Sequence, residues 1–161
     1  MLASSPTKQD FDREAFKLAL SDSNASPELL AAFRQAAIKL TCTGHRVLFQ
    51  KGEPGSCVYL VLTGEVGLML PVQSNRGIGF LAKSGSLVGL PAAFSKEPYS
   101  MTAVAWEGTE LAVMSREKFC DMIAVNPLLS MDVVRILAAE TRTARIAIIE
   151  SLKEQSRTTQ R

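Results

Sequence analysis

The segment around Gly89 carries residue types suited to holding an anion. Residues 89–94 read GLPAAF, a glycine followed by a proline at an early helical position, where the missing amide donor of proline is tolerated. This pattern predicts the start of a short helix. The free amides and the dipole at a helix N-terminus attract anions, although Pro91 removes one of the donors there.

Residues for metal or nucleophilic chemistry are sparse. His45 is the only histidine, whereas cupin-type metal sites need two or three imidazoles and a Ser-His-Asp site needs one beside its nucleophile. Cys42, Cys57 and Cys120 form no closely spaced pair for zinc binding or thiol exchange. We therefore expect no enzyme activity, no metal site and reduced, mostly buried thiols. Haem ligation by His45 or redox sensing by Cys57 stays open as an alternative.

A turn and two apolar strands occupy the centre of the chain. Residues 52–55 (GEPG) form the turn, and residues 58–63 (VYLVLT) form a strand that is apolar on both faces. Residues 63–65 (TGE) then reverse the chain before a second alternating strand over residues 66–70. A strand apolar on both faces belongs inside a sandwich or roll. Further strands are expected over Arg46–Phe49, Ile78–Ala82 and Leu87–Leu90.

Helices are predicted before these strands. Asp10 can cap a first helix running through Phe11 to Leu18. Ser26 followed by Pro27 announces a second helix, whose apolar stripe is predicted to continue to Leu40.

A long helix is predicted at the other end, from Asn126-Pro127 to about Gln155. One apolar seam on it consists of Val134, Leu137, Thr141, Ala144, Ile148 and Leu152. A second apolar set lies off that seam and consists of Ile136, Ala139, Ile146 and Ile149. A helix with two such faces can pack on its own domain and on a partner helix together, so we predict a homodimer through the seam.

Five short segments follow one another along the chain in an order and spacing typical of a known family. They are QKGEPGS, VYLVLTGEV, SGSLVGLPAAF, TELAVMSREKF and AVNPLLSMDVVRIL. Over Phe33–Lys153 the chain thereby resembles the cyclic nucleotide-binding effector domain of the catabolite activator protein and fumarate and nitrate reduction regulator family. The resemblance implies a mainly β fold of the α+β class. It is a jelly-roll-like β roll (a double-stranded β-helix) with N-terminal helices and a long C-terminal dimerisation helix. The expected parts of this one domain are residues 1–40 (helical), 41–125 (roll) and 126–161 (helix and polar tail).

The resemblance also locates the phosphate-binding cassette, which in the family carries a glutamate for the ribose hydroxyl and an arginine for the phosphate. Here Gly89 is kept, but Leu90 replaces the acid and Tyr99 replaces the arginine, while Ser100 keeps a hydroxyl and an amide. Losing both charged partners should cost about 3 to 5 kcal/mol, so a cyclic nucleotide should bind roughly a hundredfold to several thousandfold more weakly. Restoring Glu at 90 and Arg at 99 is predicted to regain about 3 kcal/mol of binding. The ligand-contacting positions implied are Gly89, Leu90, Tyr99, Ser100, Met101, Thr143 and Ala144, with Phe94 and Trp106 as further apolar lining.

Composition narrows the function further. A net charge of +2 gives no general attraction to nucleic acid, and no apolar run is long enough to span a membrane. Residues 1–9 lack a signal-peptide pattern, so we expect a cytoplasmic protein. No helix-turn-helix segment follows Gln155, so we expect no sequence-specific DNA binding by this chain.

The sequence therefore predicts a non-catalytic sensor or regulatory module with a small-molecule effector and no certain cofactor. A cyclic nucleotide is the effector that the resemblance implies, with weakened binding. The alternatives are a dimeric scaffold or interaction protein with a closed pocket, and the haem or redox sensor.

Overall fold

Two packed sheets and a long helix make up the protein. The computed structural model describes residues 15–20, 24–73 and 76–159. One sheet has the strand order β1 (Phe16–Ala19), β6 (Arg76–Lys83), β5 (Glu65–Gln73), β8 (Thr102–Ala105) and β3 (Arg46–Phe49). The other has the order β2 (Ile38–Thr41), β9 (Glu110–Ser115), β4 (Cys57–Thr63) and β7 (Leu87–Val88). The helices are α1 (Pro27–Ala36), α2 (Leu90–Ser95), α3 (Arg116–Ala124) and α4 (Pro127–Thr159). Every strand pairing is antiparallel except that of β1 with β6, and the predicted β roll is confirmed.

Strand β4 has two apolar faces, as the sequence predicts. Val58 and Leu60 are fully buried in a cluster with the helices α1, α3 and the start of α4. Val61 belongs to the other cluster, which fills the interior of the roll, and Tyr59 packs against it. The strand therefore separates two cores, which explains why alternate positions are both apolar.

The turn after β4 is a corner between the sheets. β4 and β5 do not pair with each other, since β5 lies between β6 and β8 in the other sheet. Gly64 has φ +83°, and a Cβ there would lie 2.6 Å from the Thr109 hydroxyl oxygen. That hydroxyl donates to the carbonyl of Glu65 and accepts from its amide, so the corner is held from the side.

The N-terminal prediction is partly wrong. Residues 10–14 lie outside the described residues, but Phe16–Ala19 is a strand and not the end of a helix. This strand hydrogen bonds to the edge of β6, and the ring of Phe16 meets that of Trp106 edge to face at 5.3 Å. Sheet pairing and burial of one aromatic ring override the local helical pattern.

The second predicted helix is confirmed at its start and wrong at its end. The Ser26 hydroxyl caps α1 by accepting from the amide of Leu29 at 3.2 Å. The helix ends at Ala36, however, and Leu40 lies in β2 opposite Leu111. Strand β2 satisfies the free edge of β9, so tertiary pairing ends the helix one turn early.

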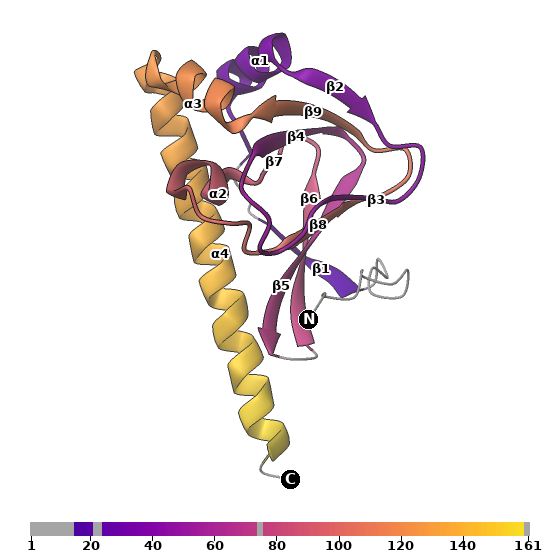
Figure 1. The fold of residues 1–161 in the computed structure, drawn as a ribbon. Helices are drawn as coiled ribbons and strands as arrows, with labels where there is room; N and C mark the ends of the chain where they lie inside the picture. The colour runs from indigo at the N-terminus through magenta and orange to yellow at the C-terminus, as the bar shows by residue number, and fades with distance from the viewer. Residues whose placement is uncertain (1–14, 21–23, 74–75, 160–161) are drawn as a thin grey trace.

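The long helix α4 runs along one side of the roll (Figure 1). Its buried residues are Leu129, Val133, Ile136 and Ala147, which form the stripe that faces the roll. The predicted long helix is confirmed. Its predicted seam contains none of these buried residues, because that seam lies beside the buried stripe, with Val134 and Leu152 exposed. None of the helices in the described residues is long and apolar enough to cross a membrane.

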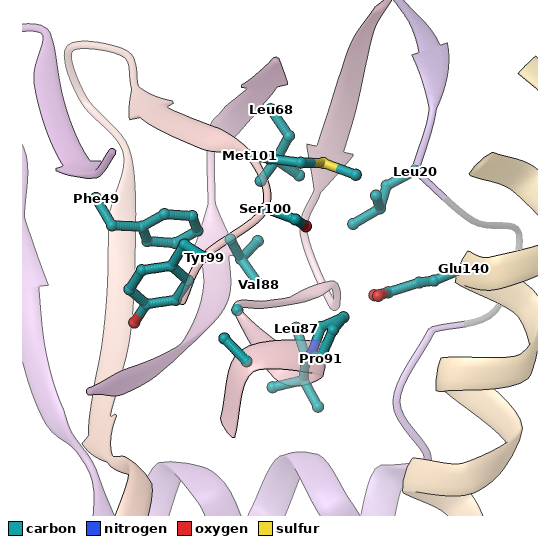
Figure 2. A pocket seen from close by; sticks show the side chains of 12 residues that line it. Leu20, Phe49, Leu68, Leu87, Val88, Pro91, Tyr99, Ser100, Met101 and Glu140 are labelled. Carbon is teal, nitrogen blue, oxygen red and sulfur yellow. The ribbon is translucent and has the colours of Figure 1, made fainter. Parts of the chain in front are cut away.

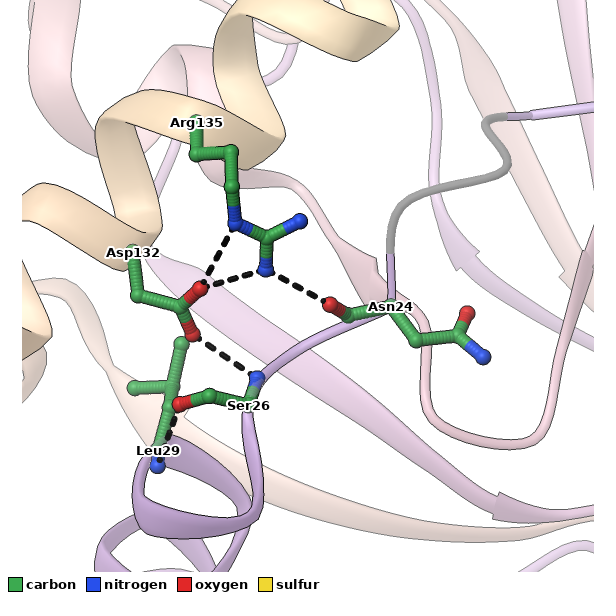
Figure 3. A network of polar contacts seen from close by, with 5 residues as sticks. All are labelled: Asn24, Ser26, Leu29, Asp132 and Arg135. Atoms are coloured by element: carbon green, nitrogen blue, oxygen red, sulfur yellow. Dashed lines mark hydrogen bonds and ion pairs between the residues drawn. The ribbon is translucent and has the colours of Figure 1, made fainter.

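A polar cluster fixes the first part of α4 to the start of α1 (Figure 3). The Asp132 carboxylate accepts from the amide of Ser26 at 2.8 Å and from Arg135 Nε at 3.1 Å. Arg135 also donates to the carbonyl of Asn24 at 2.9 Å. Burial acts to raise the pKa of Asp132, but the hydrogen bonds from Ser26 and Arg135 outweigh it and hold that pKa below its ordinary value.

Candidate ligand-binding site

Two adjoining cavities lie between the roll, α2 and α4. The first has a volume of about 50 Å³ and the second, which opens toward α4, about 440 Å³. Leu20, Pro91, Ser100, Met101 and Glu140 line both. The first is completed by Phe49, Leu68, Leu87, Val88, Gly89, Ala92 and Tyr99, and Figure 2 shows these side chains around it. The second is completed by Leu70, Phe80, Thr141, Ala144, Arg145, Ile148 and Ile149. The walls are mostly apolar, as suits a small organic ligand.

Tyr99 closes the roll end of the first cavity. Its ring stacks on that of Phe49, with centroids 3.7 Å apart and planes 11° from parallel. Its hydroxyl donates to the carbonyl of Cys57 at 2.7 Å and accepts from the Cys57 amide at 3.0 Å. Burial raises the pKa of Tyr99, which keeps the hydroxyl neutral. Tyr99 is thus a fully partnered structural group as well as part of the cavity wall.

The segment after Gly89 forms the predicted short helix, α2. Gly89 has φ +88°, and a Cβ there would lie 3.0 Å from the carbonyl oxygen of Cys57, so the turn requires a glycine. Leu90 is fully buried in the cluster around α1 and α3 and lines neither cavity. Pro91 lines both and supplies no amide donor. Arg116 Nε donates to the carbonyl of Ala93 at 2.6 Å and fixes α2 against α3.

Glu140 is the site residue that sequence reasoning missed. It projects from α4 toward Ser100, Pro91 and Leu20, with its carboxyl group at the cavity (Figure 2). Within the described residues it makes no hydrogen bond or ion pair, and burial raises its pKa to about 8. A signal was present in the sequence. Glu140 interrupts the stripe of α4 that faces the roll, four residues after Ile136.

The predicted ligand-contacting residues separate into two groups. Gly89, Tyr99, Ser100 and Met101 line the first cavity, and Ala144 lines the second. Leu90 and Thr143 line neither.

The further apolar lining that the resemblance implied is not present. Phe94 packs on Phe119, with ring centroids 6.0 Å apart, and Trp106 packs on Phe16. Both lie outside the two cavities, because each ring is held by a neighbouring aromatic ring.

The residues of the haem or redox alternative lie apart from the cavities. His45 is exposed, and neither His45 nor Cys57 lines either cavity. Within the described residues no cluster of three or more histidine, cysteine, aspartate or glutamate side chains could hold a metal ion.

The residues of the predicted dimer seam also fall on two different sides of α4. Val134, Leu137 and Thr141 line a shallow groove on the outer side of α4, together with Ala138, Arg142 and Arg145. Ala144 and Ile148 turn inward and line the second cavity, and Leu152 is exposed beyond it. The inner and outer faces of α4 therefore meet along the predicted seam.

The roll, the short helix after Gly89 and the long C-terminal helix define the fold of a regulatory effector domain. A family model described as "Cyclic nucleotide-binding domain" matches residues 40–126, which is more than half of the chain. The chain belongs to the cyclic nucleotide-binding domain family.

Individual relatives agree with this assignment. The cyclic AMP receptor protein of Thermus thermophilus is 30% identical over 103 residues, which cover 63% of this chain and 47% of that protein. The crystal structure of the catabolite activator protein of Thermus thermophilus matches with a TM-score of 0.67 and 26% identity, covering 81% of this chain and 60% of that one. The chain thus spans about half the length of the curated relative that it matches.

The same domain also occurs in an enzyme. A cAMP-binding acyltransferase from Mycobacterium smegmatis matches with a TM-score of 0.55 and 26% identity, covering 69% of this chain and 34% of that one.

Proposed function

We infer that this chain is a non-catalytic, dimeric regulatory module whose effector is a small molecule other than a cyclic nucleotide. The observation that carries this is the charge of the site. Among the described residues that line the first cavity there is no lysine or arginine, and Glu140 is the one ionisable side chain besides Tyr99. A cyclic phosphate placed there would meet a carboxyl group and no cation, which disfavours its binding.

The surroundings of Tyr99 and Leu90 give a second reason to expect weak binding of a cyclic nucleotide, besides the loss of the two charged residues from the phosphate-binding cassette. The position of the family's arginine holds Tyr99, whose hydroxyl is already used by the backbone of Cys57. The position of the family's glutamate holds Leu90, whose side chain is buried elsewhere. The nearest lining cation is Arg145, an exposed residue of α4 that reaches the second cavity only.

Calorimetry with cyclic AMP and cyclic GMP tests this function. We expect no binding tighter than about millimolar, since the family's two charged contacts together contribute about 3 to 5 kcal/mol. Micromolar binding of either nucleotide by the natural chain would contradict the proposal and would place the anion on Ser100 or Arg145.

The dimer is supported by apolar side chains on the outer side of α4. Val134 is 56% exposed and Leu152 is 49% exposed, and about five turns separate them on one side of the helix. Exposed apolar positions that repeat along a long helix favour pairing with a second copy. Replacing Val134 and Leu152 together by Glu should shift the protein to monomers in light scattering at micromolar concentration. The matched control is Leu128→Glu, an exposed leucine on another side of α4, which should leave the dimer intact.

The absence of catalysis and of sequence-specific DNA recognition by this chain is supported by the lining of the cavities. No histidine lines either cavity, and within the described residues the Ser100 hydroxyl makes no hydrogen bond with the Glu140 carboxyl that would pair a nucleophile with a base. The net charge of +2 gives little attraction to the DNA backbone. A gel-shift assay at about 0.15 M salt should give no sequence-dependent complex, and a salt-resistant, sequence-dependent shift would contradict this part of the proposal.

A further inference from the structure

We propose that the cavity binds an organic cation, an amine carried on an apolar body, with the Glu140 carboxylate as its counter-ion. This rests on the proposed function and names the chemical class of its effector. Figure 2 shows the juxtaposition that carries the inference, in which the Glu140 carboxyl group faces an otherwise apolar chamber.

The volume and lining of the cavities indicate what the uncharged part of the ligand should be. The second cavity, which Glu140 also lines, has a volume of about 440 Å³, within the range that holds drug-sized molecules, and the adjoining first cavity adds about 50 Å³. The stacked rings of Phe49 and Tyr99 form its inner wall, with Leu68 and Val88 beside them. Aromatic and aliphatic walls suit a ligand with an aromatic or aliphatic body.

The charges around Glu140 indicate what the charged group of the ligand should be. From the end of β1 the residue facing Glu140 is Leu20, from α2 it is Pro91, and from the segment before β8 they are Ser100 and Met101. None of these is charged. On α4 itself, Arg145 lines only the second cavity and makes no ion pair with Glu140. Glu140 is therefore a carboxyl group in apolar surroundings with no cation of its own chain beside it.

An unpaired carboxylate in such surroundings is unstable, so in the empty cavity the group holds a proton near neutral pH. An ammonium group placed beside it reverses this preference. Binding the cation then releases the Glu140 proton to the buffer, and the ion pair is formed within the cavity. A cyclic nucleotide or a fatty acid offers no such gain, because its charge has the wrong sign.

The helix that carries Glu140 is fixed in place before any ligand arrives. The contacts of Asp132 with Ser26 and of Arg135 with Asn24 lie two turns before Glu140 on α4. The carboxyl group is thereby held toward the cavity without a hydrogen bond of its own, as a preorganised ligand contact should be.

Three probes of similar size and different charge test the inference: 2-phenylethylammonium, 2-phenylethanol and 3-phenylpropanoate. Titration calorimetry of the full chain at pH 7.5 should show binding of the ammonium probe at least tenfold tighter than that of the anion. Repeating the titration in two buffers of different ionisation enthalpy should show release of more than half a proton, since a group with a pKa of about 8 is mostly protonated at pH 7.5. Glu140→Gln should weaken the ammonium probe at least tenfold and abolish the proton release. Glu150→Gln, an exposed position of the same helix, is the matched control and should change neither.

Each other outcome overturns the inference. If the anion binds as tightly as the ammonium ion, or if Glu140→Gln leaves the ammonium affinity unchanged, Glu140 is not the counter-ion. Binding of the neutral alcohol alone would leave a sensor of apolar molecules, so the proposed function would stand while the cation would be wrong. If no probe binds up to about 10 mM, the proposal of a cationic ligand is likewise wrong. The calorimetry with cyclic AMP and cyclic GMP then tests the proposed function separately.

Discussion

The two ends of the first cavity differ in whether their polar side chain has a hydrogen-bond partner. At the roll end, the Tyr99 hydroxyl donates and accepts a hydrogen bond with one residue, Cys57, and its ring is stacked on Phe49. At the helix end, Glu140 has no partner within the described residues. A buried polar group whose bonds are all made within the chain stabilises the fold. One left without a partner destabilises it and is available to a ligand.

The largest effect we expect comes from Leu90→Glu, at a core position that lines neither cavity. Leu90 is fully buried in the cluster around α1 and α3, so the substitution places a carboxylate in an apolar core without a cation. Urea denaturation should show a loss of about 4 kcal/mol or more. Adding Tyr99→Arg removes the stacked ring as well. This replaces the sequence-based expectation that the pair of changes would regain cyclic nucleotide binding, and a stable double variant with micromolar affinity would restore that expectation.

Glu140→Gln should have the next largest effect and the opposite sign. The folded-state pKa is raised from 4.5 to about 8, so between these values the folded state holds a proton that the unfolded state has released. The stability of the natural chain should therefore fall as pH rises through this range, by up to a few kcal/mol, and level off above it. Denaturation at pH 5 and pH 8.5 should show this fall, and the variant should be much flatter. An equally steep fall in the variant would assign it to another group.

Tyr99→Phe tests the roll end of the first cavity. The stack on Phe49 is kept, while the carbonyl and amide of Cys57 lose their shared partner. We expect a loss of about 1 to 3 kcal/mol in unfolding free energy, with little effect on the binding of the ammonium probe. A variant as stable as the natural chain would show that these two hydrogen bonds contribute little.

The smallest effect should come from Asp132→Asn, which weakens the attachment of the helix that carries Glu140. The folded-state pKa of Asp132 is depressed, so its contribution is present above the unfolded value and is lost as pH falls through the folded value. We expect a loss of about 1 kcal/mol at neutral pH and a shallower decline of stability in acid. Thermal unfolding at pH 7 and pH 3 would check both. Equal losses at the two pH values would contradict the assigned role.

The sequence was sufficient for the fold because its signals are local or depend on a short repeat. The two-sided alternation over β4, the Ser26 cap of α1 and the proline after Gly89 each act within a few residues. The first predicted helix failed at Phe16–Ala19, since the edge of β6 and the ring of Trp106, both far along the chain, decide that segment.

The sequence by itself determined the β roll and the long C-terminal helix, because these follow from residue types at fixed spacing. Only the tertiary structure decided which side chains face the cavity. It turns Leu90 away into the second core, gives Tyr99 its partner on β4 and brings Glu140 against the roll. The physical reason is that helix periodicity gives the angle of a side chain about its own helix, whereas the docking of α4 on the roll determines what that side chain meets.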